Sequence, residues 1–158
     1  MTSTAPTRGS RGAALVTGGA RRIGRAIGMQ LAGDGWPVVV HCHRSTADAD
    51  ATVRAICEHG GKAEAVVADL TDAAAAEGLL PEAAAAIGAP IGCLINNASI
   101  FKNDRFDRFD PADFDAHMAV HARAPALLAA AMARQSPAVT DGVIVNLLEQ
   151  KSSNPDPT

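Results

Sequence analysis

Five short apolar runs, separated by stretches with helical spacing, constrain the fold of this chain more than any other feature. After the first run, apolar residues recur at Ile23, Ala26, Ile27 and Leu31, as they do along one face of a helix. Strands that alternate with helices build a parallel sheet joined by right-handed crossovers. We therefore expect an α/β fold with about five strands and helices on both faces. The expected strands cover residues 13–17, 37–42, 62–67, 93–96 and 143–147.

The helices are expected between these runs. They cover residues 22–32, about 46–59, an alanine-rich stretch that ends near Gly88, and about 113–134. Two prolines lie inside them: Pro81, where we expect a kink or a break, and Pro125. We expect one domain over residues 13–150, with a flexible tail at 1–12 and an unstructured tail at 151–158.

Composition excludes several classes of partner. The net charge of −3 argues against a nucleic-acid partner, and no apolar run approaches the roughly 18 residues that cross a membrane. The three cysteines are scattered, which is typical of a reducing compartment, so we expect a cytoplasmic protein. His117 and His121 have zinc-binding spacing, but Met118 stands where a metalloprotease has Glu and no third ligand is evident. We therefore expect no metal site.

The chemistry of the chain is concentrated in a glycine-containing turn. Thr17-Gly18-Gly19 follows the first apolar run, and Gly24 lies at the start of the next helix. This layout presents backbone N–H groups and a positive helix end to a phosphate. Arg25 and Ala26 replace the Lys-Ser/Thr of a P-loop, and Arg22 stands where a further glycine would be expected. The turn by itself is therefore also compatible with a tight connection that binds nothing.

The end of the second strand indicates which dinucleotide such a turn would hold. A site for NAD requires an acid there, whereas residues 41–45 read His-Cys-His-Arg-Ser and the next carboxylate is Asp48, inside the following helix. Arg44 and Arg22 favour a 2′-phosphate, which guanidinium groups bind through paired hydrogen bonds. The alternative is that both arginines are solvated surface residues.

Four segments together resemble the short-chain dehydrogenase/reductase family, in particular its pteridine-reductase-like branch. Residues 17–24 are similar to the cofactor turn of that branch, residues 41–45 to its H-Y-H-R-S segment, Asp69-Leu70 to its adenine-contacting pair, and residues 96–99 to N-N-A-[GS]. The resemblance implies an incomplete Rossmann-type sheet with strand order 3-2-1-4-5 and NADP(H) as cofactor. The implied cofactor-binding residues are Gly18, Arg21, Arg22, Ile23, Gly24, His43, Arg44, Ser45, Asp69, Leu70, Asn97, Ala98 and Ser99.

Two catalytic positions depart from the family pattern. His121 stands where the family has Asn, and Glu149 stands where it has Ser or, in this branch, Asp. The catalytic Tyr and Lys of the family would lie beyond Thr158, and the sequence contains no tyrosine. We expect an NADP-dependent oxidoreductase that transfers hydride to a carbonyl or pterin-like C=N group and here lacks its Tyr-x-x-x-Lys part. The alternative is a non-catalytic dinucleotide-binding remnant.

The resemblance also implies partners. The substrate would be a small carbonyl or pterin-like molecule, and full-length relatives would form homo-oligomers. Residues 143–148 would leave an apolar strand at the edge of the sheet, so we expect this chain to be prone to aggregation.

Overall fold

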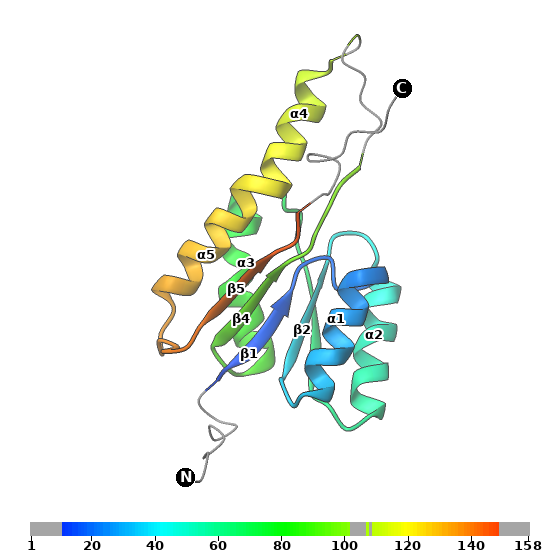
Figure 1. Cartoon of the computed structure of the whole chain (residues 1–158), viewed down its shortest axis with the longest axis vertical. Coiled ribbons are helices and arrows are strands. Elements are labelled where there is room, and N and C mark those ends of the chain that lie inside the picture. The colour runs from blue at the N-terminus through cyan, green and yellow to red at the C-terminus, as the bar shows by residue number, and fades with distance from the viewer. Residues whose placement is uncertain (1–10, 102–106, 108, 149–158) are drawn as a thin grey trace.

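One parallel sheet organises the chain, and its strands lie in the order β3-β2-β1-β4-β5. The structure is a computed structural model that describes residues 11–101, 107 and 109–148. The predicted fold class and strand order are therefore confirmed, and Figure 1 shows the strands with their flanking helices. The strands are β1 (Ala13–Val16), β2 (Val38–Cys42), β3 (Ala63–Val67), β4 (Ile91–Asn96) and β5 (Val143–Asn146).

Helices cover both faces of the sheet. The connections contain α1 (Arg22–Gly33), α2 (Thr46–Glu58), α3 (Ala73–Ile87), α4 (Pro111–Met118), a π-helix η2 (Ala119–Arg123) and α5 (Ala124–Arg134). Side chains alternate between the faces of a strand. Leu15 therefore belongs to the core beneath α3 and α5, whereas its neighbour Val16 belongs to the core beneath α1 and α2. β1, β2 and β4 are buried along their whole length, as expected for strands covered on both sides.

β4 begins earlier than the sequence analysis predicted, at Ile91. The early start includes Gly92, where a Cβ would lie 1.7 Å from the carbonyl oxygen of Arg11. A glycine inside a strand commonly marks such a close approach of another backbone segment. Arg11 itself, which we assigned to the N-terminal tail, lies with its guanidinium 5.5 Å from the Trp36 ring. The tails at 1–10 and 149–158 lie outside the described residues.

Pro81 does not break α3, which runs without interruption to Ile87. A proline at this position cannot donate to the carbonyl of Glu77. Glu77 and Pro81 are both exposed, so water can serve the carbonyl that the proline leaves without a donor. The helix therefore accommodates a residue that sequence reasoning treats as an interruption.

The predicted helix at 113–134 is longer and less regular than expected. It begins at Pro111, because the Asp110 side chain accepts a hydrogen bond from the Ala112 N–H and caps the first turn. The wide turns of η2 directly precede the proline-containing start of α5 at Ala124-Pro125. Together these segments form a long rod that extends past the carboxyl edge of the sheet (Figure 1).

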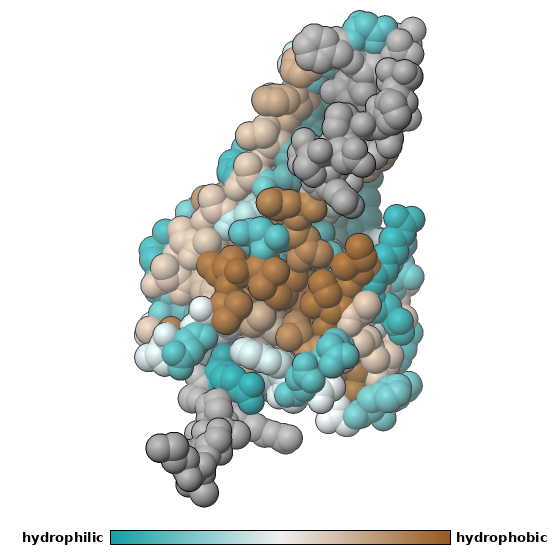
Figure 2. Space-filling model, viewed as in Figure 1, coloured by the Kyte–Doolittle hydropathy of each residue, from teal (hydrophilic) through white to brown (hydrophobic). Residues whose placement is uncertain are grey.

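β5 is an exposed edge strand, as the apolar run at 143–148 predicted. Val143, Ile144 and Val145 are each more than two-fifths exposed. Figure 2 shows an apolar area on the face of the molecule that carries the strands, between α5 and α1. Among the described residues, no helix is long and apolar enough to cross a bilayer.

Candidate dinucleotide-binding site

The turn after β1 is closely packed. Gly18 has a φ of 63°, a backbone conformation that favours glycine. A Cβ at Gly24 would lie 2.2 Å from the carbonyl oxygen of Gly18, so no side chain fits between the turn and the start of α1. These two glycines, both predicted to bind cofactor, give the connection its compact shape.

Arg22 occupies the left-handed region, with a φ of 48°. The sequence pattern predicts a glycine at this position, and the backbone does adopt the conformation that glycine favours although the residue is an arginine. Holding a non-glycine residue in this region costs on the order of 1–2 kcal/mol. Arg22 is exposed at the first position of α1. The packing of the surrounding turn therefore imposes this conformation, which an arginine does not favour by itself.

Thr17 and Asn97 join the turn after β1 to the turn after β4. The buried Thr17 hydroxyl accepts hydrogen bonds from the N–H groups of Asn97 and Ala98, each at 3.0 Å. The Asn97 amide in turn donates to the carbonyl oxygens of Thr17, at 2.9 Å, and Gly18, at 3.1 Å. The reciprocal contacts fix the two loops relative to each other at the carboxyl edge of the sheet.

His41 supports the same turn from β2. Its Nδ1 lies 3.1 Å from the Gly18 backbone nitrogen, and its Nε2 lies 3.1 Å from the carbonyl oxygen of Ala68. The ring is only 2% exposed. Burial lowers the pKa of His41, with a smaller contribution in the same direction from nearby His43; the hydrogen bond to the Ala68 carbonyl partly opposes this shift. His41 is thus held as a neutral ring within the fold.

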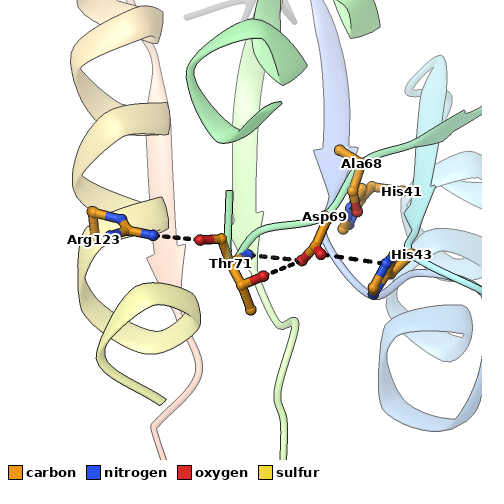
Figure 3. A network of polar contacts seen from close by, with 6 residues as sticks. All are labelled: His41, His43, Ala68, Asp69, Thr71 and Arg123. Atoms are coloured by element: carbon orange, nitrogen blue, oxygen red, sulfur yellow. Dashed lines mark hydrogen bonds and ion pairs between the residues drawn. The ribbon is translucent and has the colours of Figure 1, made fainter. Parts of the chain in front are cut away.

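A polar network follows β3 (Figure 3). One carboxylate oxygen of Asp69 accepts hydrogen bonds from the Thr71 hydroxyl, at 2.7 Å, and the Thr71 N–H, at 2.9 Å. These two bonds are the main cause that lowers the pKa of Asp69. The other carboxylate oxygen lies 3.6 Å from His43 Nε2, and Arg123 donates to the Thr71 carbonyl from η2. The network orders the loop that the resemblance places beside an adenine.

A pocket of about 570 Å³ lies beside these residues. Arg21 and Arg44 line it together, whereas Arg22, which we expected to act with Arg44, is not among its lining residues. Arg21 Nε is bound to Asp48 Oδ2 at 2.6 Å, so the carboxylate of α2 orients this guanidinium. The predicted residues that line the pocket are Gly18, Arg21, His43, Arg44, Ser45, Asp69, Leu70, Ala98 and Ser99.

A second pocket, of about 300 Å³, adjoins the first and shares Leu70, Ala98 and Ser99 with it. It contains three further predicted positions, Ile23, Asn97 and His121, whereas Arg22 and Gly24 line neither pocket. His121 accepts a hydrogen bond from the Ile100 N–H at its Nε2, at 3.2 Å, so its role includes holding the loop after β4. Glu149, the other predicted catalytic position, lies outside the described residues.

Asn96 contributes a buried polar atom to this second pocket. Its Nδ2 donates to Asn146 Oδ1 at 2.8 Å and links β4 to β5. Its Oδ1 is buried with no hydrogen-bond partner among the described residues. Buried acceptors are normally satisfied, so this atom marks a position where a bound group or water would find an acceptor.

The described residues contain no group of three His, Cys, Asp or Glu side chains that could hold a metal ion.

The arrangement fits a dinucleotide. The compact glycine turn admits a phosphate close to the backbone, two arginines lie in one pocket, and an adjoining pocket offers apolar walls with amide groups. The fold and site thus define a dinucleotide-binding domain of the Rossmann type. The short chain dehydrogenase family matches residues 12–157, and the chain belongs to that family.

Three proteins similar to this chain are longer than it is. FolM alternative dihydrofolate reductase 1 from Brucella canis, solved in complex with NADP, is 41% identical and superposes with a TM-score of 0.86 over 96% of this chain and 60% of its own. A short chain dehydrogenase from Burkholderia cenocepacia, also solved with NADP, is 34% identical, with a TM-score of 0.86 over 96% of this chain and 61% of its own. An uncharacterized oxidoreductase from Methylorubrum extorquens is 45% identical over 56% of this chain and 36% of its own length. The chain therefore spans only part of the length of these three relatives.

Sequence reasoning missed several residues that build the site. Thr17, Thr71 and Arg123 act through hydrogen bonds between segments far apart in the sequence, and no local spacing indicates such bonds. His41 did carry a signal, because a histidine inside an otherwise apolar strand must find polar partners when it is buried. The pairing of Arg21 with Asp48 had no signal, because it depends on how α2 packs beside the turn.

Proposed function

We propose that this chain binds NADP(H) along the carboxyl edge of its sheet. The observation that carries the proposal is that Arg21 and Arg44 line one pocket with Asp69 and Leu70. Guanidinium groups bind phosphate oxygens through paired, charge-assisted hydrogen bonds. The 2′-phosphate of NADP would lie between the two arginines. The NADP complexes of the FolM and Burkholderia relatives support the same assignment.

The pyrophosphate would lie against the start of α1. This helix of 12 residues has no side-chain cap among the described residues and no acid in its first turn. Its first N–H groups lack acceptors within the helix, and the helix end carries a partial positive charge. The neighbouring glycine turn removes side chains that would keep a phosphate away. Together these features favour an anion at the turn.

We propose hydride transfer to a carbonyl or pterin-like C=N group as the reaction of the whole protein. Bound NADPH would supply the hydride. The adjoining pocket would hold the reacting ring and the substrate between Ile23, His121 and Leu147. Membership of the short chain dehydrogenase family supports the reaction class, and similarity to a dihydrofolate reductase supports a pterin-like substrate. Glu149 and His121 are the residues proposed to face the substrate.

We propose that the 158 residues bind the cofactor without turning it over. The sequence contains no tyrosine, so the tyrosine acid that the family uses is not available from these residues. Glu149 or His121, the two predicted catalytic positions, would have to donate the proton in its place, and we propose that they do not. The chain would then act as a cofactor-binding unit. An assay of NADPH oxidation with carbonyl and pterin substrates tests this, and robust turnover would contradict it.

Cofactor titration tests the binding proposal. We expect NADPH to bind more tightly than NADH. Arg44→Ala should weaken NADPH binding by roughly tenfold to a hundredfold, which corresponds to about 1.5–3 kcal/mol for hydrogen bonds to a charged group. NADH binding should be unchanged in this variant. Arg54→Ala is the matched control, because Arg54 is an exposed arginine of α2 that does not line the pocket. Equal affinity for both cofactors in the wild type would overturn the assignment.

We also propose that the chain associates with itself through β5. Among the described residues β5 is the last strand of the sheet, so it exposes apolar side chains and one row of backbone groups that pairs with no further strand. The proposed contact runs along the length of β5, whereas the second pocket takes only Asn146 from the carboxyl end of this strand.

A further inference from the structure

One side chain, His41, connects the two halves of the proposed cofactor site. Its ring lies between the Gly18 N–H of the β1 turn and the carbonyl of Ala68, which directly precedes Asp69 (Figure 3 shows the Ala68 side of this arrangement). The backbone of the same residue also holds the turn, since its carbonyl accepts from the Gly19 N–H at 2.9 Å. His41 therefore contacts Gly18, Gly19 and the segment that leads to Asp69.

The two partners determine which ring nitrogen carries the proton. Gly18 offers an N–H donor, so Nδ1 must be the acceptor in that contact. Ala68 offers a carbonyl acceptor, so Nε2 must carry the hydrogen. Only the neutral ring protonated at Nε2 satisfies both partners. A ring protonated at Nδ1 would place two donors against each other and leave Gly18 without an acceptor.

The Gly18 contact bears directly on a phosphate site. Gly18 adopts a left-handed conformation and lies one residue after Thr17, whose hydroxyl ties the turn to Asn97. An acceptor on its N–H fixes the direction in which the following peptide groups point. Loss of that acceptor would leave the Gly18 N–H without its partner, and the turn would then depend on the Asn97 contact and on the backbone bond from Gly19 to His41.

We propose that His41 is a positioning residue for cofactor binding, and that its neutral imidazole holds the Gly18 turn in the conformation that receives the phosphates of the dinucleotide. This inference rests on the proposed function. His41 lines the larger pocket, but its role is to orient the turn by means of Nδ1. The same ring links that turn to the Asp69 loop. One side chain would therefore fix the position of the phosphate-binding turn relative to the loop proposed to contact the adenine.

Three substitutions of His41 distinguish a positioning role of its side chain from a packing role. His41→Asn places an amide near the Nδ1 position and can retain the acceptor for Gly18. His41→Gln reaches the Nε2 position and can retain the contact with Ala68. His41→Leu fills the space but retains neither contact. We expect NADPH affinity to fall at least tenfold in His41→Leu and His41→Gln and to stay within about threefold of the wild type in His41→Asn.

Thermal unfolding of the same variants supplies the comparison. If His41 only fills the core, NADPH affinity will follow the melting temperature across the three variants, and rescue by Asn will be absent. That result would overturn the positioning role. Absence of NADPH binding by the wild type would instead defeat the proposed function, and the positioning role with it.

Nitrogen-15 NMR of the histidine-labelled wild-type chain tests the inference without any substitution. We expect His41 to be neutral and protonated at Nε2 at pH 7, and its Nδ1 resonance to shift as NADPH is added. His59 is the internal control, because its Nδ1 bonds to Ala55 on α2 and it lines neither pocket. A His41 ring protonated at Nδ1, or an Nδ1 resonance that ignores bound NADPH, would overturn the proposal even if every variant failed to fold.

Discussion

Asn97 closes the space into which a side chain at Gly24 would project. Its Nδ2 donates to the carbonyl oxygens of Thr17 and Gly18, and a Cβ at Gly24 would lie 2.5 Å from that nitrogen. The space at Gly24 is therefore limited both by the Gly18 carbonyl of its own turn, 2.2 Å from the Cβ position, and by Asn97, which follows a different strand. The close approach of the two loops at the carboxyl edge makes the turn both compact and rigid.

Gly24→Ala should destabilise the fold and weaken cofactor binding together. The new methyl group would push against the Gly18 carbonyl and the Asn97 amide, and overpacking of this kind costs about 1–3 kcal/mol. Urea unfolding and NADPH titration measure the two effects. Gly78→Ala is the control: no atom lies within 4 Å of its Cβ position in α3, so it should stabilise the helix by about 0.5–1 kcal/mol. An unchanged Gly24→Ala protein would show that the turn can relax.

Arg22→Gly should be more stable than Arg22→Ala. Both variants remove the arginine side chain, but alanine retains the cost of a φ of 48° and glycine does not. The expected difference is roughly 1 kcal/mol in the free energy of unfolding. Chemical denaturation of the two variants side by side measures it. If alanine proved the more stable residue, the backbone at this position would not be left-handed in solution.

Stability should fall as the pH is lowered from about 7 to 5.5, in part through His41. Burial lowers the pKa of His41 in the folded chain below its ordinary value of 6.5. Below pH 6.5 the unfolded chain therefore binds a proton that the folded chain does not, which favours unfolding. The loss is on the order of 1 kcal/mol per pH unit until the folded ring also titrates.

Urea midpoints at the two pH values measure this dependence. His41→Asn should flatten it, because the variant has no imidazole to protonate at that position. Gly78→Ala, which adds and removes no titratable group, serves as the control and should leave the slope near that of the wild type. An identical slope in His41→Asn would assign the pH dependence to other groups.

Val145→Lys should reduce self-association. Val145 is 41% exposed on β5, and a lysine on an edge strand opposes the pairing of that edge with another strand. Gel filtration over a range of concentrations should show a shift toward the monomer. Val67→Lys is matched to it, since Val67 is 51% exposed at the end of β3, the opposite edge of the sheet. An equal effect of both variants would point to net charge as the cause.

Much of the fold follows from local pattern. The apolar run before Thr17 and the helical spacing after Arg22 predicted β1 and α1 closely, because a strand buried on both faces needs a continuous apolar run. Pro81 and Pro125 were harder to interpret. A proline removes one donor, and only the surroundings decide whether water or a wider helical turn compensates for it.

The sequence by itself determined the class of this protein: alternating strands and helices, a glycine turn at the first strand, and basic residues in place of an acid after the second. These features depend on residues close together in the chain. Only the tertiary structure decided that Arg21 lies with Arg44 in one pocket, that Asn97 lies against the space beside Gly24, and that His41 bridges Gly18 and Ala68. Those relationships join residues from separate strands and helices, and packing brings them within hydrogen-bond or van der Waals distance.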